Sequence, residues 1–405
     1  VSDPAESVEP RILDAYADGT VIAGWRTFGT PSHLYTRELP PGSSTWTDPV
    51  RVDAGDQSVV TASLTPTATG AIATWSACTD TPGECPMFMA EKAPGAAAWG
   101  TAVLVSDPAE STGDPRIARA ADGTTVAVYT RDEGGLHRAM AAVRQPGEET
   151  FGSPVPLGDP SPIASQTRVE ALPNGDAVAA WSEVTPSPTA STAKVAVYDH
   201  DTATWGTTVP VGVGMSFFPQ PVATVRGDIV LASLDYADGF RGYSQHRLAG
   251  QDSFSAPVAA FGMSGLHALT SLLGRPDGSV LGIHLSMGGS GLNLAAATWD
   301  PDSHAWSDEP LVSEQPIALN AGTVSSGNAV ADAAFAWQTT SHQIVVAVAD
   351  GSRPTIESLD APATGVSGEA LAFSATGHDA LSPPVALRWS FGDGEDTTGA
   401  SVSHA

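Results

Sequence analysis

The sequence repeats itself about every 52 residues over its first 350 residues, and this period constrains the fold more than any other feature. The heptapeptide at residues 1–7 returns unchanged at residues 105–111. One ladder of equivalent, mostly aromatic positions consists of Trp25, Trp75, Tyr129, Trp181, Ser233, His284 and Trp337. A second ladder consists of Trp46, Trp99, Phe151, Trp205, Phe254 and Trp306. Such a period indicates stacked copies of one supersecondary unit.

Each copy reads as four short strands. In the first copy, residues 11–13 lead into Asp18-Gly19, and residues 20–25 follow. Asp-Gly between two apolar runs is a strong hairpin signal, because both central residues of the turn need positive φ. The signal recurs at Asp122-Gly123, Asn174-Gly175 and Asp277-Gly278, and more weakly at Thr69-Gly70 and Arg226-Gly227. No segment sustains a 3.6-residue period, so the sequence predicts an all-β chain.

The copies end near residues 53, 106, 159, 212, 261, 313 and 350. We predict a seven-bladed β-propeller of four-stranded blades over residues 1–350, because closure removes free sheet edges. The seventh copy has no Trp-led fourth strand, and Val1-Ser2-Asp3 matches the tail of one, so the N-terminal segment is the candidate closing strand. We expect the aromatic ladder to pack between sheets and function to lie on the face with the longer, variable loops.

Composition limits the possible partners and the location. The net charge is −27 with only two lysines, which disfavours nucleic acid and anionic membranes. No apolar run approaches the ~18 residues that a membrane span needs, so no membrane insertion is predicted. Without an initiator Met or signal-peptide pattern, we expect the chain to begin after a processing site or an arbitrary cut, and export is inferred.

The two cysteines, Cys78 and Cys85, flank a loop that contains Pro82-Gly83. A turn there would bring them within the ~6 Å that a disulfide needs. We predict a disulfide and hence an oxidising compartment; a pair of unpaired thiols is the alternative. Two cysteines without a set of Cys or His partners do not make a zinc site.

A polar, Gly-containing turn followed by Trp-x-x-Pro-Val closes the first copy at residues 41–50, and a related turn and Trp lie at 94–99. With this motif, the blades resemble those of sialidase-type, or BNR-repeat, propellers. The family's Asp box, Ser-x-Asp-x-Gly-x-Thr-Trp, is absent from every copy. The resemblance therefore implies an architecture and leaves the activity open.

From Pro354 the sequence changes character and resembles a PKD domain, an immunoglobulin-like β-sandwich. The marker is Trp389-Ser390-Phe391-Gly392-Asp393-Gly394, in which Trp389 and Phe391 share one side of a strand and the glycines permit the turn. Such domains continue for roughly thirty more residues, so residues 351–405 are interpreted as the N-terminal part of a truncated domain, incompletely packed in isolation.

Three arginines begin first strands in related copies: Arg11, Arg116 and Arg168. First strands line a propeller's axis, so the three could converge on an anion, and guanidinium suits a carboxylate. Sialidases bind a substrate carboxylate with three arginines, so the resemblance implies this role for Arg11, Arg116 and Arg168. Arg11 lies eight residues before its turn glycine and the other two lie seven before theirs. The alternative is common repeat ancestry, with each arginine paired to nearby Asp or Glu.

A glycosidase would also need paired carboxylates, or a Tyr nucleophile with a Glu base. The variable-face loops are expected to offer Glu133, Glu183, Asp235, Tyr236 and Asp238. No motif singles any of them out, and solvated loop residues are the alternative. Of these, Glu183 and Tyr236 join the three arginines as the candidate ligand-binding residues.

Metal binding has weaker support. Six carboxylates in fourth-to-first connections could bind calcium, namely Asp3, Glu6, Glu9, Asp107, Glu110 and Asp114. They lack the dense pattern of a dedicated calcium loop, so calcium is possible and no cofactor is predicted. Three histidines that begin third strands, His33, His137 and His342, come from copies that are not consecutive, so no metal site is predicted from them. Motifs for a metalloprotease, a serine hydrolase, a phosphate loop and N-glycosylation are all absent.

The leading hypothesis is a secreted or cell-surface, monomeric, non-catalytic protein that presents propeller loops to an extracellular glycan or protein. The alternative is a sialidase-like glycoside hydrolase or lyase that acts on an acidic glycan. A structural spacer of an envelope protein is a third possibility. A fold by itself selects none of these.

Overall fold

The structure, a computed structural model, describes residues 8–16, 20–40, 43, 45–53, 55–67, 70–81, 83–186, 189–235, 241–260, 267–288, 291–311, 324–327, 333–338, 344–349, 355–362, 364, 368–378, 386–391 and 393–405. Every regular element among these residues is a β-strand, which confirms the predicted all-β class. Contacts divide the chain into two compact units, Val1–Ala329 with Ala334–Ala347, and Val330–Ala333 with Val348–Ala405. The predicted boundary after residue 350 stays a prediction.

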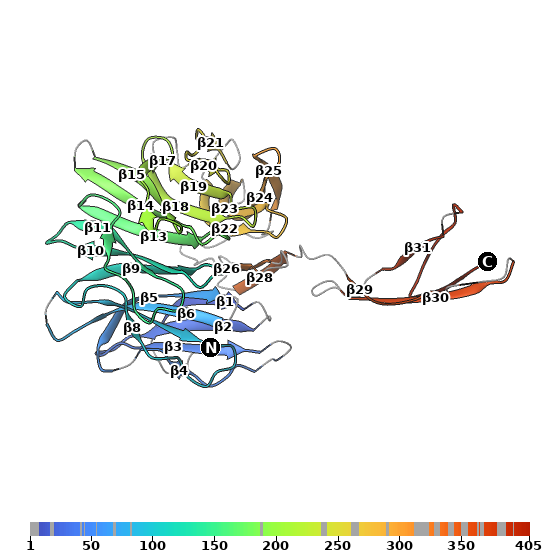
Figure 1. Ribbon diagram of the computed structural model, residues 1–405, viewed down its shortest axis with the longest axis horizontal. Helices are drawn as coiled ribbons and strands as arrows, with labels where there is room; N and C mark the ends of the chain where they lie inside the picture. Colours follow the sequence, from blue (N-terminus) through green and yellow to red (C-terminus); the bar gives the residue numbers. More distant parts are fainter. Residues whose placement is uncertain are drawn as a thin grey trace. The chain divides into compact units, whose positions relative to one another are not determined.

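The first unit is a series of sheets in which sequential strands are neighbours (Figure 1). The first sheet contains β1 (Val8–Ala15), β2 (Val21–Thr27), β3 (Leu34–Leu39) and β4 (Val50–Arg51). The second contains β5 (Ser58–Thr67), β6 (Gly70–Cys78), β7 (Met87–Lys92) and β8 (Val103–Leu104). The third contains β9 (Thr112–Arg119), β10 (Thr125–Asp132), β11 (His137–Arg144) and β12 (Val155–Pro156).

Four more sheets follow. The fourth contains β13 (Ile163–Ala171), β14 (Ala177–Pro186), β15 (Thr189–Asp199), β16 (Thr204–Trp205) and β17 (Val209–Val211). The fifth contains β18 (Ser216–Ala223), β19 (Ile229–Asp235), β20 (Arg241–Arg247) and β21 (Val258–Ala259). The sixth contains β22 (His267–Gly274), β23 (Val280–Gly288), β24 (Gly291–Asp300) and β25 (Ala305–Leu311). The seventh contains β26 (Val324–Gly327), β27 (Ala333–Gln338) and β28 (Ile344–Ala349).

The first strands of these sheets contact one another in a cycle. The order is β1, β5, β9, β13, β18, β22 and β26, and β26 contacts β1 again (Figure 1). A closed cycle of small antiparallel sheets is a β-propeller, so the predicted propeller fold is confirmed. The seventh sheet has three strands in the part of the chain that the structure describes. Residues 1–7 and 312–323 lie outside that part, so the blade count and the closing strand stay predictions.

Hydrogen bonds between neighbouring sheets recur at the period of the sequence. Ser63 Oγ donates to Pro115 O at 2.8 Å, and Thr65 Oγ1 donates to Ile117 O at 3.0 Å; each bond joins residues 52 apart. By register, Arg116 is the equivalent of Ser63 and Ala118 is the equivalent of Thr65, so each hydroxyl bonds to the carbonyl just before its equivalent residue in the next sheet.

The aromatic ladder packs in the core, as predicted. Trp25, Trp75, Tyr129 and Trp181 are each at most 4 % exposed. Trp75 belongs to the cluster that includes residues of the first and second sheets, and Trp181 to the cluster of the third and fourth. A four-stranded sheet cannot bury both faces by itself, so each sheet depends on its neighbours for stability.

Glycine closes the predicted hairpins wherever the structure describes them. Gly123, Gly175 and Gly278 have φ of 99°, 93° and 88°, values that other residues rarely adopt. Asp18-Gly19 lies outside the described residues.

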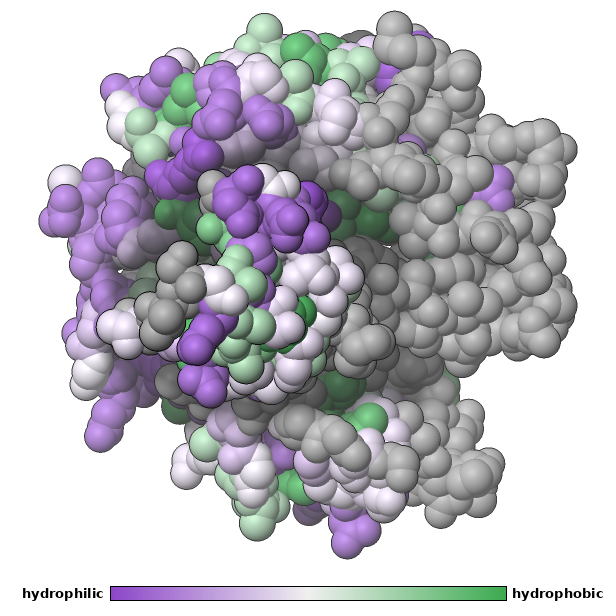
Figure 2. Space-filling model, turned by 90° about the vertical axis from the view of Figure 1, so that its right-hand side faces the viewer, coloured by the Kyte–Doolittle hydropathy of each residue, from purple (hydrophilic) through white to green (hydrophobic). Residues whose placement is uncertain are grey.

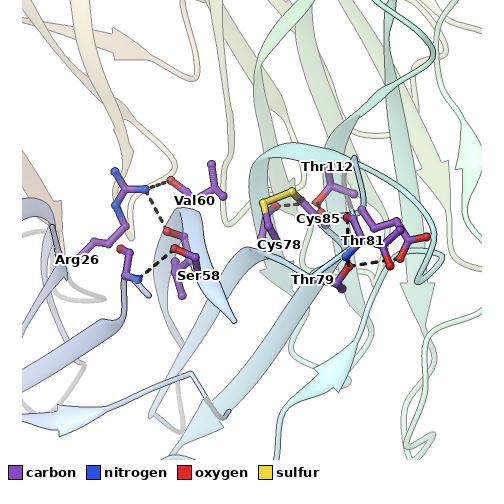
Figure 3. Close-up of a disulfide and its surroundings, with 12 residues drawn as sticks. Arg26, Ser58, Val60, Cys78, Thr79, Thr81, Cys85 and Thr112 are labelled. Atoms are coloured by element: carbon purple, nitrogen blue, oxygen red, sulfur yellow. Dashed lines mark hydrogen bonds between the residues drawn. A yellow bond between two sulfur atoms is a disulfide. The ribbon is translucent and has the colours of Figure 1, made fainter. Parts of the chain in front are cut away.

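The predicted disulfide joins Cys78, at the end of β6, to Cys85, before β7 (Figure 3). The loop it closes is attached to the third sheet, because Cys85 N–H donates to Glu110 O at 2.9 Å and Thr112 N–H donates to Cys85 O at 3.0 Å. Thr112 Oγ1 donates to the same carbonyl at 2.7 Å. Arg26 likewise joins the first sheet to the second by donating to Val59 O at 3.1 Å and to Val60 O.

The surface of the described residues is polar, in keeping with the net charge of −27. Hydrophilic residues, in purple, project from the edge of the described surface in Figure 2, and hydrophobic residues, in green, lie mostly between and behind them. Within the described residues, no helix is long and apolar enough to cross a membrane.

The second unit forms two small sheets. One contains β29 (Thr355–Asp360), β30 (Leu371–His378) and β33 (Ser401–His404), and the other contains β31 (Arg388–Ser390) and β32 (Asp396–Thr398). The rings of Trp389 and Phe391 stack with centroids 6.5 Å apart, so these side chains share one side as predicted. Phe373 packs against both rings. Ile356 and Leu359 of β29 are 65 % and 62 % exposed, in keeping with the expected incomplete packing.

Candidate ligand-binding site

A bulge in the first strand positions Arg116, and an equivalent bulge positions Arg168. In β9 the register with β10 shifts so that Arg116 pairs with Val128, and in β13 Arg168 pairs with Ala180. Each bulge contains a residue other than Gly at positive φ, Asp114 at 51° and Gln166 at 60°. Bulges redirect side chains, and here both strands redirect an arginine in the same way.

Hydrogen bonds between sheets hold these bulges. The carboxylate of Asp114 accepts the Gln166 N–H, and the Thr167 hydroxyl donates to Asp114 O. The Gln166 side-chain oxygen accepts the Phe218 N–H at 3.0 Å and so continues the series to β18. The unusual backbone conformation at Asp114 and Gln166 is therefore fixed by contacts that only the assembled ring supplies.

The two guanidinium groups lie close together and adopt similar orientations. Arg116 Nη1 donates to Pro115 O at 3.0 Å, and Arg168 Nη1 donates to Thr167 O at 2.8 Å. Burial and the neighbouring positive charge of Arg116 lower the pKa of Arg168 to about 10, although Asp114 and Glu170 act in the opposite direction. Two partly buried cations side by side favour the binding of an anion between them.

Arg11 occupies a different place in its bulge. In β1 the register shifts between Pro10, which pairs with Trp25, and Ile12, which pairs with Gly24. Ile12 is therefore the register equivalent of Arg116, and Arg11 is the residue that the register skips. The side chain of Arg11 lies outside the described part of the chain. The spacing of eight rather than seven residues to the turn glycine was the sequence signal of this difference.

Glu183 lies inside β14 rather than in a variable loop, because that strand extends to Pro186. Its side chain is buried, accepts the Trp181 indole N–H at 2.7 Å and lies 2.6 Å from Lys194 Nζ. This arrangement satisfies a buried carboxylate within the sheet. Tyr236, the other candidate, lies outside the described residues.

Two other candidate carboxylates also have partners within the protein. Glu133 Oε2 lies 3.3 Å from Arg138 Nη2, and its other oxygen contacts Arg131. Asp235 is buried at the end of β19, where Ser216 Oγ donates to it at 3.5 Å. Asp238 is outside the described residues.

The described carboxylates proposed for calcium serve structural contacts. Glu110 accepts the Tyr129 hydroxyl at 3.0 Å and lies 3.0 Å from Arg131 Nη1. Asp107 accepts the Ala109 N–H at 2.9 Å. Asp3 and Glu6, with the side chain of Glu9, lie outside the described part, so calcium binding stays a prediction.

Histidines contribute to contacts in both units. His33 Nδ1 lies 2.8 Å from Asp53 Oδ2, and the backbone of His137 bridges to Ser161; His342 is outside the described residues. In the second unit, His404 meets Asp393 and Glu395, the one group in the described residues with ligand atoms close enough for a metal ion. This group has no signal in the sequence, because only the position of β33 in the folded structure brings His404 close to Asp393 and Glu395.

The first unit is a β-propeller and the second carries a PKD domain. Residues 351–405 match the PKD domain family. The likeness to β-propeller proteins is confirmed at the level of the fold. No curated protein sequence matches the chain.

Three solved structures illustrate the similarity. A protein of unknown function from Dyadobacter fermentans is 13% identical, with 85% of this chain and 94% of that chain covered and a TM-score of 0.52. A polysaccharide lyase, an ulvan lyase bound to -[GlcA(1-4)Rha3S]-, is 9% identical, with 86% and 94% covered and a TM-score of 0.54. The β-propeller domain of the Trilobed protease from Pyrococcus furiosus, described as having an open velcro topology, is 8% identical, with 85% and 96% covered and a TM-score of 0.53. Identities this low establish the fold alone.

Proposed function

We propose that this chain is an extracellular, monomeric, non-catalytic binding protein whose propeller binds the acid group of a glycan at Arg116 and Arg168. The observation that carries the proposal is the pair of partly buried guanidinium groups, placed by equivalent bulges in neighbouring first strands. A carboxylate or sulfate between them would relieve the repulsion and accept hydrogen bonds from both.

A glycan is favoured as the source of the anion by a structural likeness. The ulvan lyase with the same fold is bound to a polymer that carries both carboxylate and sulfate groups. The PKD domain, the disulfide and the absence of a membrane-spanning helix among the described residues are compatible with an extracellular location. The acidic surface argues against nucleic acid as the anionic partner.

Binding without catalysis is favoured over glycan cleavage by the state of the described carboxylates. Glu183 and Glu133 are each paired with cations of the protein. A hydrolase needs two carboxylates free to transfer protons or attack the sugar, or a free Glu base beside a Tyr nucleophile. Neither side chain meets this requirement as it lies.

The test compares wild-type protein with the Arg116→Gln/Arg168→Gln variant on an array of neutral, uronate-containing and sulfated glycans. Loss of two charge-assisted contacts should weaken binding of acidic glycans by at least about tenfold. Arg226→Gln is the matched control, because Arg226 is exposed in a turn and pairs with Asp302.

Three outcomes would contradict the proposal. Equal binding by the wild type and the double variant would exclude the arginine pair as the site. Shortened products from a bound glycan would establish a lyase or hydrolase instead. The absence of any glycan binding would favour a structural spacer.

A further inference from the structure

A contact between third strands is repeated at the junctions between sheets. The second strand of each sheet carries the aromatic-ladder residue. We call the third-strand residue that pairs with the second-strand residue three positions before it the acceptor position. The next residue of the third strand is the donor position. The acceptor positions of the first five sheets are Glu38, Glu91, Val143, Val197 and His246. The donor positions of the second to sixth sheets are Lys92, Arg144, Tyr198, Arg247 and Trp299.

At the first two junctions a cation at the donor position meets a carboxylate at the acceptor position of the preceding sheet. Lys92 Nζ lies 2.6 Å from Glu38 Oε1, and both side chains are buried. Arg144 Nη2 makes the equivalent ion pair with Glu91. At this place in the fold, a cation of one sheet therefore binds a carboxylate of the preceding sheet.

Other contacts replace the ion pair at two later junctions. Between the third and fourth sheets, Tyr198 at the donor position accepts a hydrogen bond from Gln145 Nε2 at 2.9 Å. Between the fifth and sixth sheets, the rings of His246 and Trp299 lie 5.9 Å apart. In both cases the residue at the donor position has a partner in the preceding repeat: Gln145, just after β11, and His246 of β20.

The junction between the fourth and fifth sheets has a cation without a carboxylate. Arg247 stands at the donor position, but the acceptor position holds Val197. Arg247 Nε donates to Gln251 O, and among the described residues Arg247 makes no ion pair. The position that Glu38 and Glu91 fill in earlier sheets therefore lacks its acid.

A groove lies at this junction. It has a volume of about 580 Å³ and is lined by both Val197 and Arg247. The corresponding groove between the first and second sheets, lined by Glu38 and Lys92, has a volume of about 220 Å³. The larger groove thus occurs where the ion pair is missing.

We propose that this groove binds a uronic acid residue of an oligosaccharide, with the sugar carboxylate on Arg247 in the place that Glu38 takes beside Lys92. The rest of the lining fits a sugar. It offers the hydroxyls of Thr202, Thr204 and Ser253 and the carboxylates of Asp176, Asp199 and Asp252. Hydroxyl and carboxylate groups of this kind can exchange hydrogen bonds with ring hydroxyls. The site uses third strands and does not rest on Arg116 or Arg168 of the first strands.

The test is calorimetric titration of the full chain with trigalacturonate and, as the neutral probe, galactotriose. Trigalacturonate should bind and galactotriose should not. Arg247→Gln should weaken binding by at least about tenfold, since it removes a charge-assisted contact. Arg388→Gln, which removes an exposed arginine that pairs with Asp396, should leave the affinity unchanged.

A second variant tests the missing acid directly. Val197→Glu should pair with Arg247 inside the protein, abolish binding of trigalacturonate and maintain or raise the melting temperature. Val197→Gln has the same shape without the charge and should reduce binding less. Even if Val197→Glu fails to fold, the Arg247→Gln result remains decisive.

The proposal is overturned by any of three results: no binding of trigalacturonate to the wild type, equal binding of galactotriose, or unchanged affinity in Arg247→Gln. Measurement in the Arg116→Gln/Arg168→Gln background separates the two sites. Trigalacturonate should still bind to that variant, whatever becomes of glycan binding at the arginine pair.

Discussion

Single charged side chains join neighbouring sheets of the propeller. Glu91 of the second sheet accepts hydrogen bonds from Arg119 and Arg144 of the third. Lys92 of the second sheet pairs with Glu38 of the first, which also accepts the Tyr16 hydroxyl at 2.7 Å. Substitution of one residue of such a pair should therefore weaken the junction between two sheets as well as the strand that carries the residue.

Glu91 should make stability depend on acid pH. The hydrogen bond from Arg119, assisted by Arg144, lowers the pKa of Glu91 from 4.5 to about 2. The folded protein therefore binds this proton less readily than the unfolded chain, and the stabilisation is present above pH 4.5 and lost as the pH falls towards 2. The difference in unfolding free energy between wild type and Glu91→Gln should shrink over that range in urea denaturation.

The control for this prediction is the same comparison in an Arg119→Gln/Arg144→Gln background. Without the two cations the pH-dependent part of the difference should disappear. A difference that stays constant between pH 5 and pH 3 in the wild-type background would contradict the assignment.

Lys92 should contribute much more than an exposed cation. Lys92→Met leaves the buried Glu38 carboxylate without its counter-charge, which should reduce the unfolding free energy by about 3 kcal/mol. Arg226→Gln, which breaks the exposed pair with Asp302, should cost less than about 1 kcal/mol. Equal losses in the two variants, measured by urea denaturation, would refute this account of the first junction.

Strands and turns differ in how far the sequence predicts them. The Asp-Gly turns and the aromatic ladder could be predicted, because their signals are local. Gly123 and Gly278 both have positive φ, and Trp75 and Trp181 are both buried. The positive φ of Asp114 and Gln166 could not, because bonds between sheets impose it. The seven-residue spacing of Arg116 and Arg168 brought them to the same register, and the extra residue after Arg11 marked the strand that differs.

The carboxylates show the same limit at the candidate site. Glu183 looked like a loop residue because strand ends are poorly marked in sequence. Its ion-pair partner Lys194 belongs to the next strand, where it stands opposite Trp181. The acceptor position beside Arg247 holds Val197 instead of a carboxylate. This difference can be found only when the third strands of successive sheets are aligned by their hydrogen bonds.

The disulfide should stabilise one loop and, through it, one junction. Closing the short loop between Cys78 and Cys85 should contribute about 2 kcal/mol by restricting the unfolded chain. Cys78→Ser/Cys85→Ser should lose this amount in urea denaturation, and reduced wild type should match the variant. No change in the variant would mean that the contacts of Cys85 with Glu110 and Thr112 hold the loop without the cross-link.

The first unit as a whole determines which residues can act together. First strands follow one another around the ring, so Arg116 and Arg168, 52 residues apart in sequence, become neighbours. Third strands do the same for Val197 and Arg247. The two anion sites that we propose therefore lie at separate places on the ring, on a protein with a net charge of −27.

The most direct measurement is a crystal structure of the chain with an acidic oligosaccharide selected on the glycan array. The account predicts a carboxylate or sulfate group within hydrogen-bonding distance, about 3 Å, of both Arg116 and Arg168. A saccharide that lies on other residues while these two guanidinium groups contact protein and water alone would contradict it.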